Sequence, residues 1–272
     1  MSGPSTSDRS DPDSLGMLED ALRKSMLAAS GPELDSALAD LGWADMLAEM
    51  SDQAIPLVFR LLGETGSHAS VLNDVVLLTA GREEGLTPAL PFAGGGWVEW
   101  DYAREPASTA LGGLPLHPVD EGGHLRLPDA RRAVGWWLVG TARAMLTLAC
   151  RHALDREQFG KPIASFQAVR HRLAETLVAI EGAEATLGLS GVDNPDLTAL
   201  LAKAAAGKAA LTAAKNCQQV LGGIGFTAEH ALHHHVQRAL VLDGLLGSSR
   251  ELTKRAGAGL RARGSVPRLA TL

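Results

Sequence analysis

The stretch DREQFGKPIASFQAVRHRLAE, residues 155–175, is the strongest clue to the architecture of this protein. It places an arginine, a Phe-Gly pair and a proline in a short turn between two segments with helical patterns. A guanidinium at Arg156 can bind a phosphate or a carboxylate through two nitrogens, and Phe159 can place its ring beside a flat ligand. A plain helix–helix turn, with Arg156 on carbonyl groups and Phe159 in the core, fits the same residues. Taken alone, the stretch leaves both interpretations open.

Helical patterns continue on both sides of this turn. Apolar and small residues recur at helical spacing over 129–156, 165–189, 197–221 and 248–263, and we expect a helix over each range. Asp129 stands where the first of these helices begins, and we predict that it caps that helix. Long helices joined by short turns favour an antiparallel four-helix bundle over residues 129–272.

The first half of the chain divides into three parts. Residues 1–14 lack apolar periodicity, and we predict a disordered tail. Residues 15–80 show helical patterns and form a small helical region, whereas residues 81–128 are rich in glycine and proline and alternate short apolar runs with turn signals. We therefore predict a mainly α fold with a small β segment in the middle.

Composition argues against several classes of function. Lys and Arg number 25 against 31 Asp and Glu, a net charge of −6, so no positive excess is available for a nucleic-acid backbone. No apolar run approaches the roughly 18 uninterrupted residues of a membrane-spanning helix, and the first residues lack the apolar core of a signal peptide. Cys150 and Cys217 lie in apolar helical contexts without metal-ligand spacing, so we expect buried thiols in a cytoplasmic protein.

A second stretch, NCQQVLGGIGFTAEHALHHHVQRALVL at residues 216–242, follows the alanine-rich third helix. No strand precedes Gly222, Gly223 and Gly225, and they lack the G-x-G-x-x-G spacing of a dinucleotide loop, so we predict that they break the helix. The backbone amides freed there, together with Gln219, can bind a ligand. The four histidines of EHALHHH have no convergent carboxylate or cysteine, and we predict no metal site.

Together the two stretches resemble the C-terminal helical domain of the flavin-dependent acyl-CoA dehydrogenase family, over about half the chain from Asp129 onward. The helical region before residue 81 resembles a shortened N-terminal domain of that family, and residues 81–128 resemble a reduced middle β domain. The resemblance implies FAD as cofactor and oxidation of an acyl-CoA thioester to the trans-2-enoyl-CoA. In that reaction a carboxylate removes the α-proton, and the β-hydrogen leaves as hydride to the flavin.

The resemblance also assigns roles to the motif residues. Arg156 would bind the FAD pyrophosphate, and Phe159 would contact the cofactor. The glutamines and glycines would line the adenosine end, usually of a flavin held mainly by a neighbouring subunit. The expected flavin-binding residues are Arg156, Phe159, Gln167, Gln219, Gly222, Gly223 and Ser249.

The catalytic base of the family is missing from this chain. The family carries a glutamate directly before a Gly-Thr pair, whereas this chain reads LLGSSREL, so Gly247 takes the place of the base. Ala130 occupies the alternative base position that some members use on the first bundle helix. Asp243 and Asp129 are the nearest carboxylates, and they are more typical of a surface charge and a helix cap.

The missing base implies a heteromer. Small members without a base occur in this family beside a full catalytic subunit, notably in actinobacterial steroid breakdown. We therefore expect an α2β2 assembly in which a larger acyl-CoA dehydrogenase subunit supplies the glutamate and an electron-transfer flavoprotein accepts the electrons. The alternative is a non-enzymatic scaffold of the same fold that binds no flavin. The retained Arg156, Phe159 and Gln219 count against a scaffold.

Overall fold

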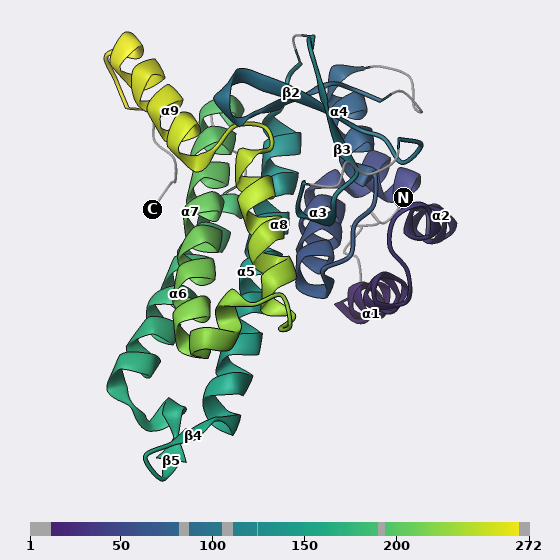
Figure 1. Ribbon diagram of the computed structural model, residues 1–272. Coiled ribbons are helices and arrows are strands. Elements are labelled where there is room, and N and C mark those ends of the chain that lie inside the picture. Colours follow the sequence, from purple (N-terminus) through teal and green to yellow (C-terminus); the bar gives the residue numbers. More distant parts are fainter. Residues whose placement is uncertain (1–11, 82–86, 105–110, 124, 190–193, 267–272) are drawn as a thin grey trace, which may run out of the picture.

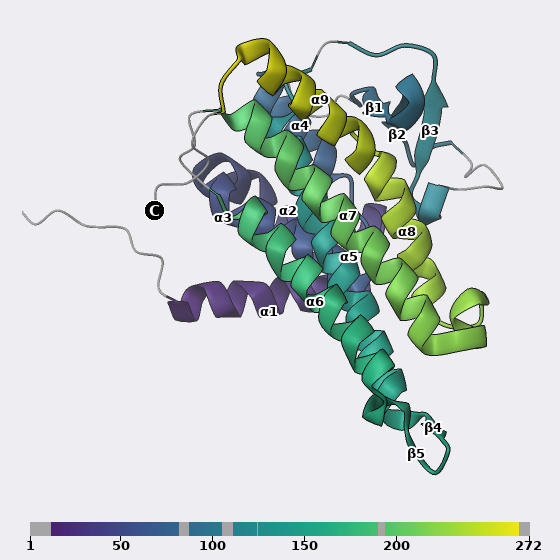
Figure 2. The same ribbon diagram turned by 90° about the vertical axis from the view of Figure 1, so that its left-hand side faces the viewer.

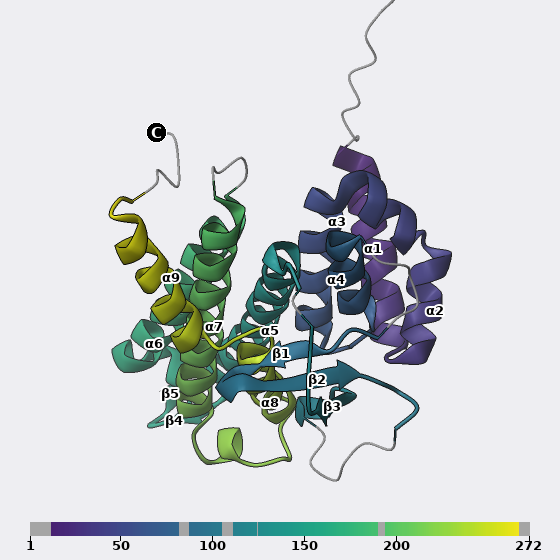
Figure 3. The ribbon, with the colours of Figure 1, turned by 90° about the horizontal axis from the view of Figure 1, so that it is seen from above.

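The computed structural model describes residues 12–81, 87–104, 111–123, 125–189 and 194–266 (Figure 1). Seen from above, the N-terminal helices lie on one side of the long helix α5 (Pro128–Asp155), most of the remaining helices lie on the other, and a small sheet runs along the same side of both groups (Figure 3). The prediction of a mainly α fold with a small β segment is confirmed.

The N-terminal region consists of α1 (Pro12–Ala28), α2 (Pro32–Asp40), α3 (Trp43–Thr65) and α4 (Val71–Ala80). Residues 12–14, predicted as part of the tail, are helical, and the rest of the predicted tail lies outside the described residues. Helix α3 packs closely against α5 through two glycines. A Cβ on Gly140 would lie 2.0 Å from the Arg60 carbonyl oxygen, and one on Gly63 would lie 2.4 Å from that of Trp137. Only glycine permits this approach of the two backbones.

Three antiparallel strands form the middle segment: β1 (Leu90–Phe92), β2 (Gly96–Trp100) and β3 (Leu116–Val119), in the order β1-β2-β3. Leu90, Val98 and Trp100 are buried, and the Trp100 ring lies 6.1 Å from that of Trp137 on α5. The sheet is therefore fixed to the bundle by aromatic packing.

The C-terminal half contains α5 (Pro128–Asp155), α6 (Gln167–Leu187), α7 (Pro195–Leu221), α8 (Leu232–Gly244) and α9 (Ser249–Arg263). The four predicted helices are present, but α9 packs mainly on α7, whereas α8 packs on both α5 and α7 and completes the bundle. Leu232, Ala239 and Leu242 on α8 are fully buried, while α9 buries little beyond Leu252 and Ala256. Assigning the fourth place in the bundle to residues 248–263 was therefore wrong.

Asp129 does not cap α5. The helix begins at Pro128, and Leu127 occupies the cap position without a side-chain bond. Proline suits this place because it lacks the amide hydrogen that a cap would satisfy. The Asp129 carboxylate instead accepts a hydrogen bond from Thr79 Oγ1 at 3.2 Å.

Two segments, Pro128–Asp155 and Pro195–Phe226, are long and apolar enough to cross a membrane. Of the most apolar window in each, 67% is buried inside the protein. Burial against neighbouring helices is typical of core helices, so their length and composition are weak evidence for a membrane span.

Candidate functional site

The predicted turn after α5 forms a hairpin that projects beyond the bundle (Figures 1 and 2). Its two short strands are β4 (Glu157–Gln158) and β5 (Lys161–Pro162). The Ile163 amide donates to the Arg156 carbonyl oxygen at 2.8 Å and closes the base of the hairpin. These backbone bonds hold a short loop in one shape at the far end of the bundle.

Phe159 lies at the tip of this hairpin and is 91% exposed. Its φ is 55°, a left-handed conformation that is strained for a bulky residue. The ring meets Phe166 edge to face, with 6.0 Å between centroids. The interpretation in which Phe159 fills the core is therefore wrong.

Arg156 follows α5 directly and is exposed. Within the described part of the chain its guanidinium has neither a hydrogen-bond partner nor an ion-pair partner, so the interpretation in which it bonds helix carbonyls is also wrong. Gln167, the first residue of α6, is likewise exposed. The hairpin and the start of α6 thus present an unpaired cation, an exposed ring and an amide side chain to the surroundings.

The glycine stretch forms a corner near the same end of the bundle (Figure 1). Helix α7 ends at Leu221, Gly222 has a φ of 66°, and a short 3₁₀ turn follows, so the predicted break is confirmed. Gln219 and Gly223 are exposed, and no atom lies within 4 Å of where a Gly223 Cβ would stand. Burial, and then repulsion from His230 beyond this corner, lowers the pKa of His152 near the end of α5. The loop after the corner therefore lies near the end of α5, where the hairpin begins.

Gly247 lies at the opposite end of the bundle, between α8 and α9. It lines a pocket of about 610 Å³ together with Phe92, Trp97 and Arg131. Ser249 is buried here, and its amide donates to Asp243 Oδ1 at 3.1 Å. The structure therefore separates Ser249 from the other six expected flavin-binding residues.

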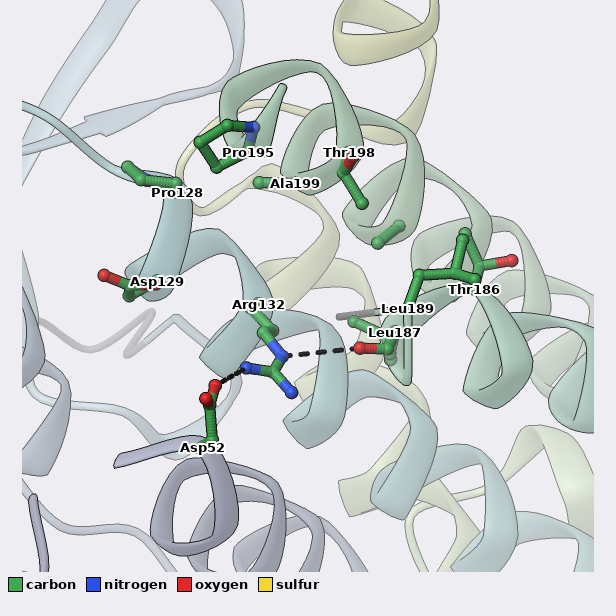
Figure 4. A pocket seen from close by; sticks show the side chains of 11 residues that line it. Asp52, Pro128, Asp129, Arg132, Thr186, Leu187, Leu189, Pro195, Thr198 and Ala199 are labelled. Atoms are coloured by element: carbon green, nitrogen blue, oxygen red, sulfur yellow. Dashed lines mark hydrogen bonds and ion pairs between the residues drawn. The ribbon is translucent and has the colours of Figure 1, made fainter. Parts of the chain in front are cut away.

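Neither nearby carboxylate takes the place of the base. Asp243 accepts the Ser249 amide bond and packs tightly on α7, where a Cβ on Gly207 would lie 2.1 Å from Asp243 Oδ1. Asp129 lines a different pocket, of about 230 Å³, beside the ion pair of Arg132 and Asp52 (Figure 4). Both aspartates are absent from the residues that line the pocket beside Gly247.

Residues 125–258 match the family described as acyl-CoA dehydrogenase, C-terminal domain. The chain carries an acyl-CoA dehydrogenase C-terminal domain. Among curated relatives it is 37% identical to acyl-CoA dehydrogenase FadE34 of Mycobacterium tuberculosis over 175 residues, 60% of this chain and 24% of that protein. It is 39% identical to acyl-CoA dehydrogenase IpdE2 of the same species over 117 residues, 43% of this chain and 37% of the relative. The match spans well under half the length of these relatives.

Solved structures share the fold of this chain. A steroid acyl-CoA dehydrogenase, the Tcur3481–Tcur3483 G363A variant, superimposes with a TM-score of 0.68 at 20% identity, covering 93% of this chain and 98% of that one. The ChsE4–ChsE5 complex of Mycobacterium tuberculosis gives 0.63 at 18% identity, covering 95% and 93%. Butyryl-CoA dehydrogenase of Megasphaera elsdenii gives 0.64 at 16%, covering 96% and 100%.

A residue that the sequence motifs did not indicate, Lys203, lies beneath Gly247. Lys203 on α7 is fully buried, and its ammonium donates to the carbonyl oxygens of Asp243 at 2.7 Å and Gly247 at 2.6 Å. Burial lowers the pKa of Lys203 to about 7. Its signal in the sequence is a lysine on the alanine face of a core helix.

The start of α9 is fixed by a capping box that joins it to the sheet. Ser248 Oγ accepts from the Glu251 amide, and Glu251 accepts from the Ser248 amide at 2.9 Å. Glu251 also accepts from the Gly94 amide at 2.9 Å. The Ser-x-x-Glu spacing is the signal that predicts this cap.

Neither a metal cluster nor a disulfide is present among the described residues. In that part of the chain no three side chains of His, Cys, Asp and Glu gather as metal ligands. Cys150 and Cys217 are free thiols, half-buried and buried respectively. Burial raises the pKa of Cys217 to about 12, so it stays protonated and unreactive.

Proposed function

We propose that this chain is a subunit of a cytoplasmic, FAD-dependent acyl-CoA dehydrogenase that works as a heteromer, with the catalytic glutamate supplied by a larger partner subunit. The observation that carries the proposal is the contrast between the two ends of the bundle. At one end Arg156 and Phe159 are exposed, and Arg156 has no hydrogen-bond or ion-pair partner among the described residues. At the other, Gly247 stands at the base position, and Asp243 and Asp129 are held by other groups.

The exposed residues fit one wall of a flavin nucleotide site. Arg156 offers a guanidinium fork for the pyrophosphate, while Phe159 offers a ring face, and the open corner at Gly222 and Gly223 lets a ligand approach the backbone. Gln167 and Gln219 supply amide groups for the adenosine. Because all six are surface residues, the opposite wall must come from another subunit.

The bound flavin would accept the β-hydrogen of the acyl thioester as hydride. In this scheme the residues of this chain bind and orient the cofactor. Asp196 and Glu251 line the pocket beside Gly247, but neither stands at the base position of the family, so we propose that the α-proton goes to a carboxylate of the partner. Loss of a general base alone costs about 10²–10⁴-fold in rate, which would leave the isolated chain nearly inactive.

The separation of Ser249 from the other flavin-binding residues supports an assembly with flavins at subunit interfaces. A single flavin does not reach both ends of this bundle, so Ser249 serves a different flavin from Arg156. We propose an α2β2 tetramer on this ground. The two-protein names of the ChsE4–ChsE5 and Tcur3481–Tcur3483 structures agree with a heteromer.

The substrate is an acyl-CoA, and the named relatives favour one derived from a steroid. One structural neighbour is a steroid acyl-CoA dehydrogenase, and both mycobacterial relatives are acyl-CoA dehydrogenases. We propose an electron-transfer flavoprotein as the electron acceptor.

The test is co-expression with the acyl-CoA dehydrogenase encoded beside this chain, followed by measurement of the ratio of flavin to subunit. We expect a yellow complex that oxidises acyl-CoA, and loss of activity without loss of flavin when the partner's catalytic glutamate becomes glutamine. Robust oxidation by the single chain would contradict the proposal. If the complex contains no flavin, whichever partner is co-expressed, the non-enzymatic scaffold is favoured instead.

A further inference from the structure

The loss of the catalytic base does not explain the size and the lining of the pocket beside Gly247. It lies between β1, the start of α5 and the start of α9, and its volume of about 610 Å³ is that of a small-molecule site. Apolar side chains form most of its wall: Pro91, Phe92, Trp97, Leu125, Leu127, Leu200, Leu246 and Leu252.

Arg131 is the buried charged group of this wall. Only 6% of Arg131 is exposed, and its Nε donates to the Leu246 carbonyl oxygen at 3.3 Å. Among the residues that the structure describes, no carboxylate lies within ion-pair distance of Arg131, and its two terminal nitrogens form no hydrogen bond. Burying a guanidinium without a charge partner costs free energy, and a bound anion would offset this cost.

Other charges of the pocket add to this cation. Arg126 and Arg255 also line the pocket and are positive, whereas Asp196 and Glu251 line it and are negative. Glu251 is engaged, since it accepts hydrogen bonds from the Gly94 and Ser248 amides. Burial, followed by repulsion from Arg255, lowers the pKa of Arg131 to about 10, while Asp196 opposes this shift. Arg131 and Arg255 line the same pocket, and Arg131 remains positive near neutral pH.

We propose that the pocket beside Gly247 binds an organic carboxylate with an apolar body, held through its carboxylate by Arg131 and Arg255. Both arginines line the pocket, and a guanidinium can bind a carboxylate through two nitrogens. The eight apolar wall residues match the body of the ligand and disfavour a bare inorganic anion. Glycine at position 247 removes the carboxylate that the family places there, and of the two that line the pocket, Asp196 and Glu251, Glu251 is held by the Gly94 and Ser248 amides. The proposal does not rest on Arg156 or Phe159, because the hairpin lies at the other end of the bundle.

Calorimetric titration of the purified full chain tests the ligand class with three probes: octanoate, 1-octanol and inorganic phosphate. We expect octanoate to bind at least about tenfold more tightly than 1-octanol, because a hydrogen-bonded charge contributes at least that factor. Phosphate should bind more weakly than octanoate. Equal affinity for octanoate and 1-octanol, or tighter binding of phosphate, would overturn the proposal.

Variants test the residues. Arg131→Gln and Arg255→Gln should each weaken octanoate binding about tenfold. The matched control is Arg132→Gln, which removes the same charge from the next residue of α5, where the side chain pairs with Asp52 in the other pocket (Figure 4). An equal loss in Arg132→Gln would show that overall charge and not the pocket binds the probe. Circular dichroism checks that each variant folds. If Arg131→Gln does not fold, the Arg255→Gln variant and the comparison of the three probes still test the proposal.

Discussion

The ammonium nitrogen of Lys203 lies 2.6 Å from the carbonyl oxygen of Gly247, so a buried cation on α7 holds the residue that stands at the base position. The same nitrogen holds the carbonyl oxygen of Asp243, the next-to-last residue of α8. The link between α8 and α9 is thereby fixed in a shape in which Gly247 has a φ of 99°.

Lys203→Met should lower the free energy of unfolding by about 2 kcal/mol or more, because two buried carbonyl groups lose their donor. Urea denaturation measures the change. Lys208→Met, at an exposed position of the same helix, is the matched control and should change stability by less than about 0.5 kcal/mol. Equal effects at both positions would refute the role of Lys203.

The stability that Lys203 provides should rise with pH. Burial lowers its pKa from 10.5 to about 7, so between these values the unfolded chain binds a proton that the folded chain does not. The free energy of unfolding of the wild type, relative to Lys203→Met, should therefore increase by up to about 2 kcal/mol from pH 7 to pH 9. Denaturation curves at several pH values test this. A difference that stays flat would mean that the folded protein keeps the ammonium charged.

Gly247→Glu should destabilise the chain without creating a working base. A side chain at a φ of 99° is strained, and its Cβ would lie 2.9 Å from Leu252 Cδ2. We expect a loss of about 1–3 kcal/mol, measured by thermal unfolding, and no acyl-CoA oxidation by the single chain. Gly182→Glu, in a helix with open space around the Cβ, is the control and should not destabilise. Acyl-CoA oxidation by the Gly247→Glu variant of the single chain would contradict the division of labour between subunits.

Arg156→Ala should lower the flavin content of the heteromeric complex at limiting FAD, while its melting temperature without flavin stays unchanged. The reason is that, within the described part of the chain, the Arg156 side chain forms no hydrogen bond or ion pair that would stabilise the fold. Arg151→Ala, at an exposed position about one turn earlier on α5, is the control and should keep the flavin. Unchanged flavin content in Arg156→Ala would exclude the pyrophosphate role.

Glu251→Ala should cost about 1 kcal/mol, because the α9 cap and the bond to the Gly94 amide are lost together. Hydrogen bonds from the Gly94 amide and then from Ser248 lower the pKa of Glu251 below its ordinary 4.5. Its contribution is therefore present above pH 4.5 and is lost as the pH falls below that value. Unfolding of both proteins between pH 3 and pH 7 measures this. A stability difference that persists at pH 3 would contradict the carboxylate bonds.

Local patterns predicted most of the helices but not their partners. The ranges 165–189 and 197–221 agree with α6 and α7 within a few residues, because helical spacing and glycine breaks are local signals. Helix α8 was missed as a bundle member because three consecutive histidines interrupt its apolar pattern, although Leu232 and Leu242 are fully buried. The start of α9 follows the Ser248 capping box, yet its pattern does not show that it packs mainly on α7.

The sequence by itself determined the helical fold class, the acyl-CoA dehydrogenase domain and the glycine at the base position, since each depends on residue identity and on spacing along one segment. Only the tertiary structure decided that Ser249 lies far from Arg156, that Lys203 supports Gly247, and that the buried Arg131 has no ion-pair partner among the described residues. Each of these relationships involves residues that are tens of positions apart in the sequence. They depend on which helix faces meet, and close packing of the whole chain sets that choice.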